Sequence, residues 1–216
     1  MEVKSLEAFN SHLDDAIERY PSLRIKSSNG QKYLKGILDI PDDNGAIIGA
    51  FSVEIHYKQG YPKRFPIIKE VGESIPDEAD WHKYPDGQCC ITVPPMEILF
   101  CRHGISLIHF IERHAIPYFA NHIYRVHFGK YKNGEYSHGK FGIREFYARL
   151  LKVESPLQWK EIVDHAFGKG HLAISRNEKC FCGSGLKFKK CHDQVFYELQ
   201  MIGEAQVRHD LKLNTA

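Results

Sequence analysis

Near the C-terminal end of the chain, four side chains of the kind that bind metals lie close together in the sequence. Cys180 and Cys182 are followed by Cys191 and His192. In a reducing cytosol, clustered cysteines with a histidine are more typical of a metal site than of disulfides. Four soft sulfur and nitrogen donors are what a tetrahedral structural zinc ion needs. We therefore predict a zinc site made by these four residues, with loose thiols in a surface tail as the alternative.

This segment resembles the SEC-C zinc motif, which occurs at the end of the bacterial SecA translocation ATPase and in many other bacterial proteins. All four ligand positions and the turn Gly183-Ser184-Gly185 are present. The glycines allow the chain to fold back sharply, so that the two ligand pairs can face one ion. Because unrelated proteins share the motif, the resemblance implies zinc and says little about activity. The basic residues around it fit an acidic partner or an ordinary solvated surface.

Composition limits the class of protein. The chain has 216 residues, of which 43% are hydrophobic and 26% charged, with a formal net charge of +2. This predicts a globular protein with one ordinary domain and a small appendage. It contains no long uninterrupted apolar stretch, and its first residues do not resemble a secretory signal. We expect a cytoplasmic protein that binds no membrane, and the near-balanced charge argues against general nucleic-acid binding.

Hydrophobic periodicity predicts a helix followed by strands in the first half of the chain. The helix runs from Leu6 to Tyr20, with Ser5 as its cap and Pro21 at its end. Two strands over residues 32–40 and 46–57 form a hairpin, because the turn between them is Pro41-Asp42-Asp43-Asn44-Gly45. A third short strand covers residues 67–71.

The rest of the chain is predicted to be helical around one irregular stretch. Residues 75–100 show neither a helical nor a strand period, and long loops in compact domains are usually functional. A central helix over residues 104–124 is expected to be kinked at Pro117. Further helices are predicted over residues 143–151 and 156–167, the second with Ser155 as its cap.

A second resemblance concerns the first half of the chain. Tyr61-Pro62 and Phe65-Pro66 are followed by a histidine-containing loop, then by Gly87, two residues, Cys90 and Ile91. The order of these features resembles the ubiquitin-conjugating enzymes. The resemblance implies an α+β, ubiquitin-conjugating (UBC-like) fold with an antiparallel meander sheet over residues 1–125. A helical extension over 126–172 and a SEC-C-type zinc motif with a terminal helix over 173–216 would complete the chain.

The chain also departs from that family. Its members carry His-Pro-Asn before the cysteine, whereas this chain has His82-Lys83-Tyr84, with the histidine eight positions before Cys90 instead of ten. The asparagine that supports the oxyanion is therefore missing, the family's later tryptophan is absent, and Pro94-Pro95 occupies that loop. The full layout resembles stand-alone ubiquitin-conjugating-like proteins of cyclic-oligonucleotide antiphage (CBASS) operons. That resemblance implies as partner the C-terminal tail of a cyclic-nucleotide synthase, or a ubiquitin-like protein.

Three cysteines compete as the nucleophile of a thioester transfer, which needs an exposed thiol of lowered pKa and donors for the oxyanion. Cys90 holds the family position in a loop bounded by glycine and proline, with His82 nearby as a further candidate catalytic residue. Cys101 is expected just ahead of the central helix, where free amides and the helix dipole would stabilise a thiolate. Cys89 is expected to point the other way from Cys90 and to be buried.

The leading interpretation is an enzyme of cysteine-dependent thioester transfer that joins a partner's C-terminus to lysine. A catalytically inactive binding module and a cysteine-dependent de-conjugating peptidase are the alternatives. No adenylating domain fits in a chain of this length, so activation must come from a partner or be bypassed. Which of Cys90 and Cys101 is the main nucleophile stays open at this point.

Overall fold

A computed structural model describes residues 2–132, 135–153, 155–169 and 174–213. They form two compact units, Met1–Thr92 with Phe100–Glu135, and Val93–Leu99 with Tyr136–Ala216. The first unit combines a sheet with helices and the second is helical, so the predicted mixed α+β class is confirmed. The boundaries of the three domains inferred from the sequence stay a prediction.

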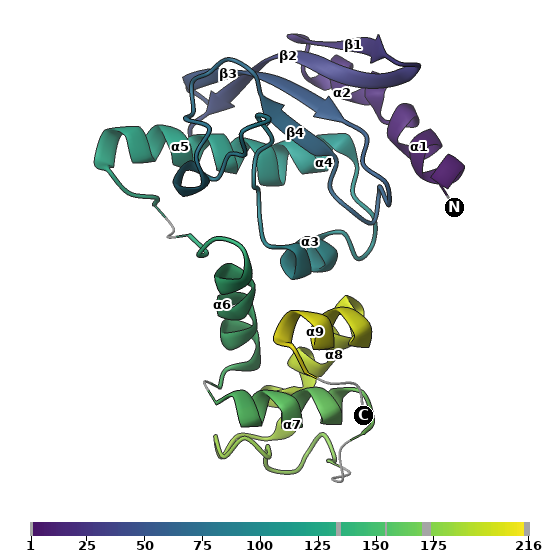
Figure 1. The fold of residues 1–216 in the computed structure, drawn as a ribbon, viewed down its shortest axis with the longest axis vertical. Coiled ribbons are helices and arrows are strands. Elements are labelled where there is room, and N and C mark those ends of the chain that lie inside the picture. The colour runs from purple at the N-terminus through teal and green to yellow at the C-terminus, as the bar shows by residue number, and fades with distance from the viewer. Residues whose placement is uncertain (1, 133–134, 154, 170–173, 214–216) are drawn as a thin grey trace. The chain divides into compact units, whose positions relative to one another are not determined.

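A four-stranded antiparallel meander forms the sheet of the first unit, with the order β1-β2-β3-β4 (Figure 1). Its strands are β1 (Leu23–Ser28), β2 (Gln31–Pro41), β3 (Ile47–His56) and β4 (Ile67–Glu70). The expected hairpin is β2 with β3, joined by a turn in which the Asp42 carboxylate accepts the amides of Asn44 and Ala46. The sequence pattern did not predict β1, because this strand buries only Leu23 and shows no alternation of buried and exposed residues.

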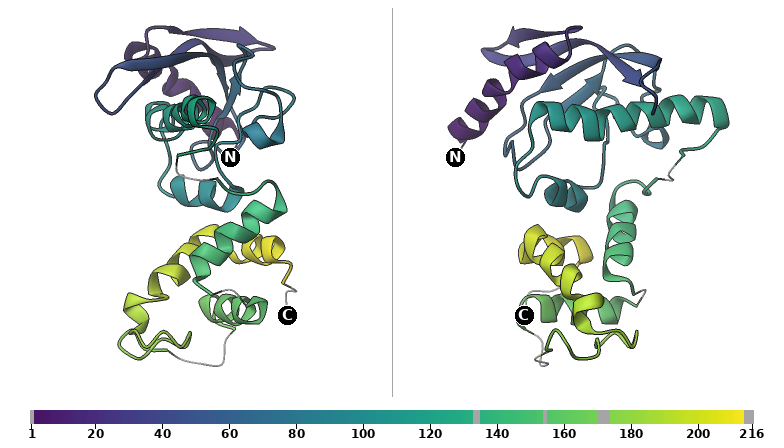
Figure 2. Two further views of the ribbon diagram at one scale, coloured as in Figure 1. Left: turned by 90° about the vertical axis from the view of Figure 1, so that its left-hand side faces the viewer. Right: turned by 180° about the vertical axis from the view of Figure 1, so that it is seen from behind.

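The opening helix differs from the prediction at both ends. It begins earlier and is broken at His12 into α1 (Glu2–Ser11) and α2 (Leu13–Arg19), seen beside the sheet in Figure 2. Ser5 therefore lies inside α1 and does not cap it. Its Oγ instead donates to the backbone oxygen of Tyr61 at 2.5 Å, which ties the helix to the segment after β3.

The central helix begins later than predicted. α4 (Leu107–Phe110) starts after Ser106, whose Oγ accepts the His109 amide as an N-cap, and it continues through the π-helical turn η2 (Ile111–Ala115) into α5 (Ile116–Phe128). The π-helical turn lies directly ahead of Pro117, whose ring removes a hydrogen-bond donor and would crowd a regular α-helix. The expected distortion at Pro117 is thus a change of helix type.

The buried face of β3 and the central helix form one core in the first unit. Phe51, Val53 and Ile55 occupy alternate positions of β3 and are buried. Phe51 stacks on Phe119 of α5 at 4.5 Å between ring centroids. The stretch over residues 75–100, which was expected to be irregular, is partly helical. It holds the 3-10 turn η1 (Ala79–Trp81) and α3 (Pro94–Phe100), because Pro94 starts a helix well where a donor is not needed.

The second unit packs helices around a core of its own. Phe146, Tyr147, Leu151, Ile162 and Leu199 are among its buried members, and Val93 at the start of the α3 segment joins them. Its further elements are α6 (Lys140–Leu151), α7 (Pro156–Ala166), the 3-10 turn η3 (Phe188–Lys190), α8 (Asp193–Ile202) and α9 (Glu204–Leu211). Ser155 holds the N-cap position of α7, as predicted, but its side chain makes no capping hydrogen bond there.

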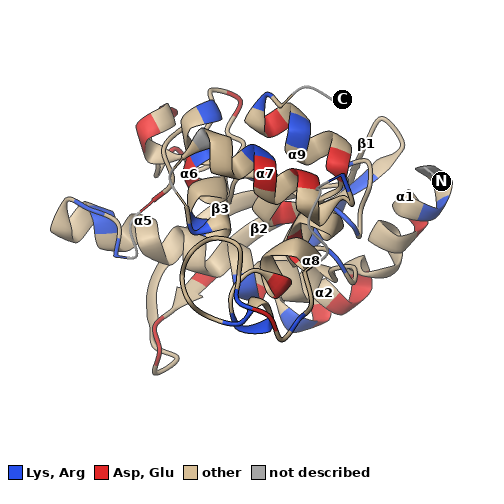
Figure 3. Ribbon diagram, turned by 90° about the horizontal axis from the view of Figure 1, so that it is seen from below, with Lys and Arg blue, Asp and Glu red and all other residues tan. Residues whose placement is uncertain are grey.

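Charged residues of both signs are mixed along the helices, as α7 and α9 illustrate in Figure 3. This pattern agrees with the small net charge of the chain. Among the residues that the structure describes, none of the helices has the length and apolar character needed to cross a membrane.

Candidate metal centre and candidate active site

The four predicted metal ligands converge in the second unit. Cys180, Cys182, Cys191 and His192 offer ligand atoms that all lie within 4.8 Å of one another. The Sγ atoms of Cys182 and Cys191 are 3.5 Å apart, and His192 Nδ1 lies 3.2 Å from Cys191 Sγ. With metal–sulfur bonds of about 2.3 Å, the edges of a tetrahedral site are about 3.8 Å long, so these spacings suit one zinc ion.

The orientation of His192 fits a metal ligand. Its ring is buried, and Nε2 lies 2.8 Å from the backbone oxygen of Leu151, the last residue of α6. Because a carbonyl oxygen can only accept, this contact places the ring proton on Nε2 and leaves the Nδ1 lone pair facing the cysteines. Burial also lowers the pKa of His192, which favours the neutral ring that a metal requires.

Local backbone geometry brings the two ligand pairs together. Gly183 and Gly185 have φ values of 78° and 74°, in the left-handed region that glycine adopts at little cost. The Cys180 amide donates to the Leu186 oxygen at 2.7 Å, which closes the turn. A small aromatic cluster supports it, with Phe188 edge-on to Phe196 of α8 at 5.0 Å between centroids.

The second candidate site is built on a small hairpin in the first unit. Lys83 pairs with Cys89 in an antiparallel bridge, the Tyr84 amide donates to the Gln88 oxygen, and the Cys90 amide donates to the His82 oxygen. Residues 82–90 thus form two short antiparallel arms joined by Pro85-Asp86-Gly87. We call residues 82–90 the cysteine hairpin.

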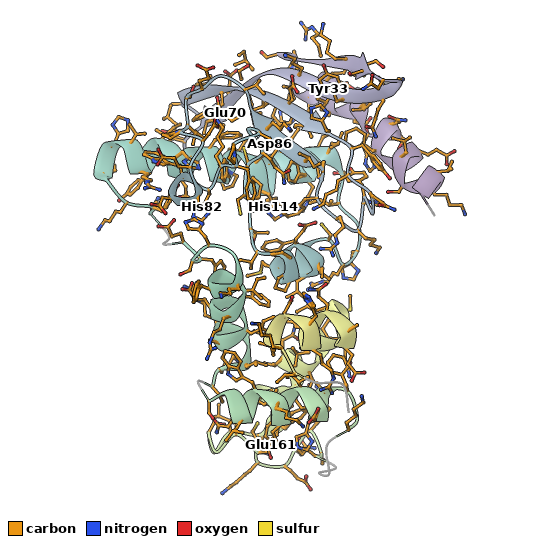
Figure 4. All side chains as sticks on the ribbon, in the orientation of Figure 1. Tyr33, Glu70, His82, Asp86, His114 and Glu161 are labelled. Carbon is orange, nitrogen blue, oxygen red and sulfur yellow. The ribbon has the colours of Figure 1, made fainter. Side chains whose placement is uncertain are left out.

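The cysteine hairpin is attached to the sheet along β4. Gln88 bridges to Lys69, the Cys89 amide donates to the Ile68 oxygen at 2.9 Å, and Gly87 accepts the Glu70 amide at 3.0 Å. Gly87 has φ of 81°, and a Cβ added there would lie 3.0 Å from the Glu70 oxygen. Because of this close approach and the positive φ, glycine is required where the hairpin meets the sheet. Figure 4 labels Glu70 together with Asp86 and His82 of the hairpin.

A buried ion pair fixes the same hairpin from inside. Lys83 Nζ lies 2.6 Å from a Glu70 carboxylate oxygen and 2.9 Å from Asp77, and it also donates to the Ile75 oxygen at 2.8 Å. The second Glu70 oxygen accepts the Gly72 amide at 2.8 Å and the Ser74 amide at 3.3 Å. These contacts hold the chain between β4 and the hairpin in place, a feature that sequence analysis missed.

The three cysteines of the first unit differ in accessibility. Cys89 is 5% exposed and Cys101 is 0% exposed, whereas Cys90 is half-buried. Cys89 and Cys90 face opposite ways, as predicted, because neighbouring residues of an extended arm alternate sides. Burial raises the pKa of the Cys89 thiol to about 12. Cys90 is thus the most exposed of these three thiols.

The electrostatic argument for Cys101 rests on a helix start that the structure does not have. The central helix begins at Leu107, six residues beyond Cys101, and Cys101 instead follows the C-terminal end of α3. A helix C-terminus carries partial negative charge, which disfavours a thiolate. Full burial adds to this effect. The role of Cys101 as a nucleophile stays a prediction, without the support of a helix N-terminus.

His82 contacts Cys90 through its backbone. Its oxygen accepts the Cys90 amide at 2.7 Å and the Tyr118 hydroxyl at 2.9 Å, while ring atom Nε2 lies 2.6 Å from the Glu135 carboxylate. The backbone of His82 is left-handed, with φ of 49°. The structure therefore gives His82 a clear part in positioning the cysteine hairpin, and its predicted catalytic role stays a prediction.

Tyr84 was not among the predicted site residues. Burial raises the pKa of the Cys90 thiol, and the nearby Tyr84 hydroxyl offsets part of that rise. The signal was present in the sequence, since Tyr84-Pro85-Asp86-Gly87-Gln88 has the proline, aspartate and glycine of a tight turn. That pattern predicts a tight hairpin, which places Tyr84 and the cysteines on opposite arms.

Comparison with known proteins assigns residues 176–193 to the SEC-C motif family. The chain carries a SEC-C motif. Over 44 residues it is 46% identical to the protein translocase subunit SecA of Ehrlichia canis (strain Jake), which is 20% of this chain and 5% of that protein. No solved structure matches the chain. The similarity to SecA concerns a short segment, so SecA's own activity does not carry over to this chain.

Proposed function

We propose that the first unit is a ubiquitin-conjugating-like enzyme that transfers an acyl group through a thioester on Cys90. The observation that carries this proposal is the state of Cys90, a half-buried thiol on a hairpin fixed to β4 and supported by a buried ion pair. Rigid support of one reachable nucleophile is what positioned covalent catalysis requires. The meander sheet and central helix also agree with the UBC-like fold that the sequence resembles.

The chemistry has two steps. The Cys90 sulfur attacks the C-terminal carbonyl of an activated partner, the leaving group departs with its electron pair, and a thioester remains. A lysine amine then attacks the thioester carbonyl, which forms an amide and releases the thiol. Burial raises the pKa of Cys90 in the free protein. The thiol must therefore lose its proton when the substrate binds or to a base that the partner brings.

The proposed partner is the C-terminal tail of a cyclic-nucleotide synthase, in antiphage defence. This part of the proposal is supported by the resemblance to the stand-alone proteins of CBASS operons. A ubiquitin-like protein is the second acyl donor of the same chemistry, since it too presents a C-terminal carbonyl. One alternative is an inactive binding module, which the raised pKa of Cys90 and the missing family asparagine favour. The other is a de-conjugating peptidase, in which water instead of lysine would attack the thioester.

We also propose that the SEC-C motif binds one zinc ion in a structural site. Cys180, Cys182, Cys191 and His192 supply four protein ligands, which fill a tetrahedral site and leave no position for a substrate. The contact from His192 to the end of α6 supports the same role, because it links the metal ligands to the helical core. A bound zinc ion would cross-link the tail and would take no part in a reaction.

The function is tested by trapping the acyl intermediate. The protein is incubated with a peptide thioester that carries the synthase C-terminal tail, and products are compared on gels with and without reducing thiol. Wild type should give an adduct that thiol removes. Cys90→Ser should give an ester that survives thiol and is cleaved by mild base, and Cys90→Ala should give neither. Cys101→Ala is the matched control and should behave as wild type.

A second arm distinguishes the alternatives. Full-length synthase, ATP and an activating enzyme replace the peptide, and thiol-resistant products are mapped for lysine linkages. A lysine-linked product that requires Cys90 supports conjugation, whereas hydrolysis of a preformed linkage supports the peptidase. An absence of all adducts in both arms would leave the binding module. Loss of activity in Cys101→Ala alone would move the nucleophile to Cys101.

A further inference from the structure

One face of the cysteine hairpin carries both Tyr84 and Cys90. In the pairing of Lys83 with Cys89, both of these residues are buried, so their neighbours along each arm project to the opposite, more exposed face. Tyr84 and Cys90 share that face and occupy diagonal positions across the two arms. An aromatic side chain reaches a diagonal neighbour in an antiparallel pair. The register therefore places the Tyr84 side chain within reach of Cys90.

Tyr84 has the chemistry of a hydrogen-bond donor to the reacting sulfur. The side chain is 52% exposed, so its hydroxyl is accessible from solvent. The negative charge of a Cys90 thiolate raises the pKa of the Tyr84 phenol, which keeps its proton available for donation. Neighbouring side chains are engaged elsewhere, since Asp86 accepts from Lys69 and His82 contacts Glu135.

We propose that the Tyr84 hydroxyl is a catalytic donor that stabilises the Cys90 thiolate and then the oxyanion formed on the acyl carbonyl. This inference deepens the proposed function and rests on it, because it assigns to Tyr84 the donor role for which the family's asparagine is missing. A neutral hydroxyl can serve in an oxyanion hole, where developing charge is stabilised by preorganised donors.

The step balances without any further reactant. The thiol proton leaves to solvent or buffer, and the sulfur electron pair forms the carbon–sulfur bond. The carbonyl π electrons move onto oxygen, where Tyr84 donates its hydrogen bond. They return to re-form the carbonyl as the leaving group departs with its bonding pair. Tyr84 keeps its proton throughout.

The test uses p-nitrophenyl acetate as acyl donor, because it needs neither a partner tail nor a lysine. The full-length protein is mixed with the ester, release of p-nitrophenolate gives the rate, and peptide mass spectrometry locates the acetyl group on Cys90. Tyr84→Phe keeps the ring and removes the hydroxyl. Tyr33→Phe is the matched control, since Tyr33 of β2 stacks on His56 of β3 in the middle of the sheet. Cys90→Ala provides the blank.

We expect Tyr84→Phe to slow acetylation of Cys90 about tenfold or more, with Tyr33→Phe within twofold of wild type. Alkylation of Cys90 by iodoacetamide should also shift to higher pH in Tyr84→Phe. A rate and pH profile equal to those of wild type, or acetylation that persists in Cys90→Ala, would overturn the inference. A Tyr84 effect together with no conjugation of any partner would instead sink the proposed function and leave the donor role of Tyr84 standing.

Discussion

Lys83 is a buried cation that links several segments around the cysteine hairpin. Its side chain is 2% exposed and that of Glu70 is 0% exposed, with 2.6 Å between Nζ and the carboxylate. Such a pair is costly to break, because loss of one partner leaves the other charged and desolvated. The same residue pairs through its backbone with Cys89, so the ion pair is coupled to the position of Cys90, the next residue.

Replacement of that cation should loosen the cysteine hairpin. In Lys83→Met, the free energy of local opening should fall by about 3 to 5 kcal/mol, because Glu70 would remain buried without its cation. Hydrogen exchange of peptides over residues 67–90, followed by mass spectrometry, should accelerate by roughly a hundredfold or more. The double variant Lys83→Met/Glu70→Gln should recover part of the loss, since a glutamine oxygen can still accept the Gly72 amide.

The matched control is Lys35→Met, which breaks an ion pair of similar length on the sheet surface. Lys35 and Glu54 are 2.8 Å apart, and the Lys35 side chain is 47% exposed. Surface pairs contribute little because water and salt screen them. If Lys35→Met and Lys83→Met changed exchange over residues 67–90 equally, burial would not be the reason for the stability of the hairpin.

At the scale of elements, α5 holds the segment ahead of the cysteine hairpin through a small aromatic cluster. His122 stacks on Trp81 and meets Tyr118 edge-on at 4.4 Å between ring centroids. Arg125 lies over the Trp81 ring at 4.1 Å from the centroid. His122 is 2% exposed, and burial, reinforced by His82, Arg125 and Lys83, lowers its pKa to about 3.

This cluster predicts a loss of stability in acid. His122 stays neutral in the folded state but takes up a proton in the unfolded chain below its ordinary pKa of about 6.5. Its contribution is therefore present above pH 6.5 and is lost as the pH falls from there toward 3. By pH 4.5 the loss should be about 2 to 3 kcal/mol. Urea unfolding at several pH values, followed by circular dichroism, measures it.

His122→Phe should flatten that pH profile, because the ring is retained and the titrating group is removed. A residual slope is expected from His114, whose pKa burial lowers to about 4. His127→Gln, at an exposed position of α5, should leave the profile unchanged. An equally steep profile in His122→Phe would assign the acid sensitivity to other groups.

At the scale of the whole molecule, the two units have separate cores, so damage to one should spare the other. The SEC-C motif lies wholly within the second unit, and His192 joins it to the end of α6. Metal binding supplies folding free energy in such small sites. The hairpin that carries Cys90 lies wholly within the first unit.

Loss of zinc should therefore unfold the tail selectively. Elemental analysis should return one zinc per chain for wild type and much less for Cys191→Ser, and a strong chelator should reproduce the variant. Limited proteolysis should then cut around residues 174–213, while the first unit stays resistant and Cys90 keeps its reactivity. Cys90→Ser, a cysteine change outside the motif, should retain its zinc. Wild-type protein with well under one zinc per chain would contradict the proposed site.

The sequence alone determined the features that depend on near neighbours. The four ligands of the SEC-C motif and its turn glycines lie within a few residues of one another, so their spacing predicts their convergence. The hairpin of β2 and β3 likewise follows from alternation and from the turn at Asp42. In each case the residues that must meet are separated by a short loop whose conformation they themselves restrict.

Only the tertiary structure decided which thiol is reachable and what surrounds it. Cys101 is at 0% exposure because distant elements cover it, and the helix expected at Gly104 begins instead at Leu107. The ion pair of Lys83 with Glu70 and the seat of Gly87 on β4 also join residues from separate strands. Burial and pairing of this kind depend on the sum of long-range contacts, which local periodicity does not encode.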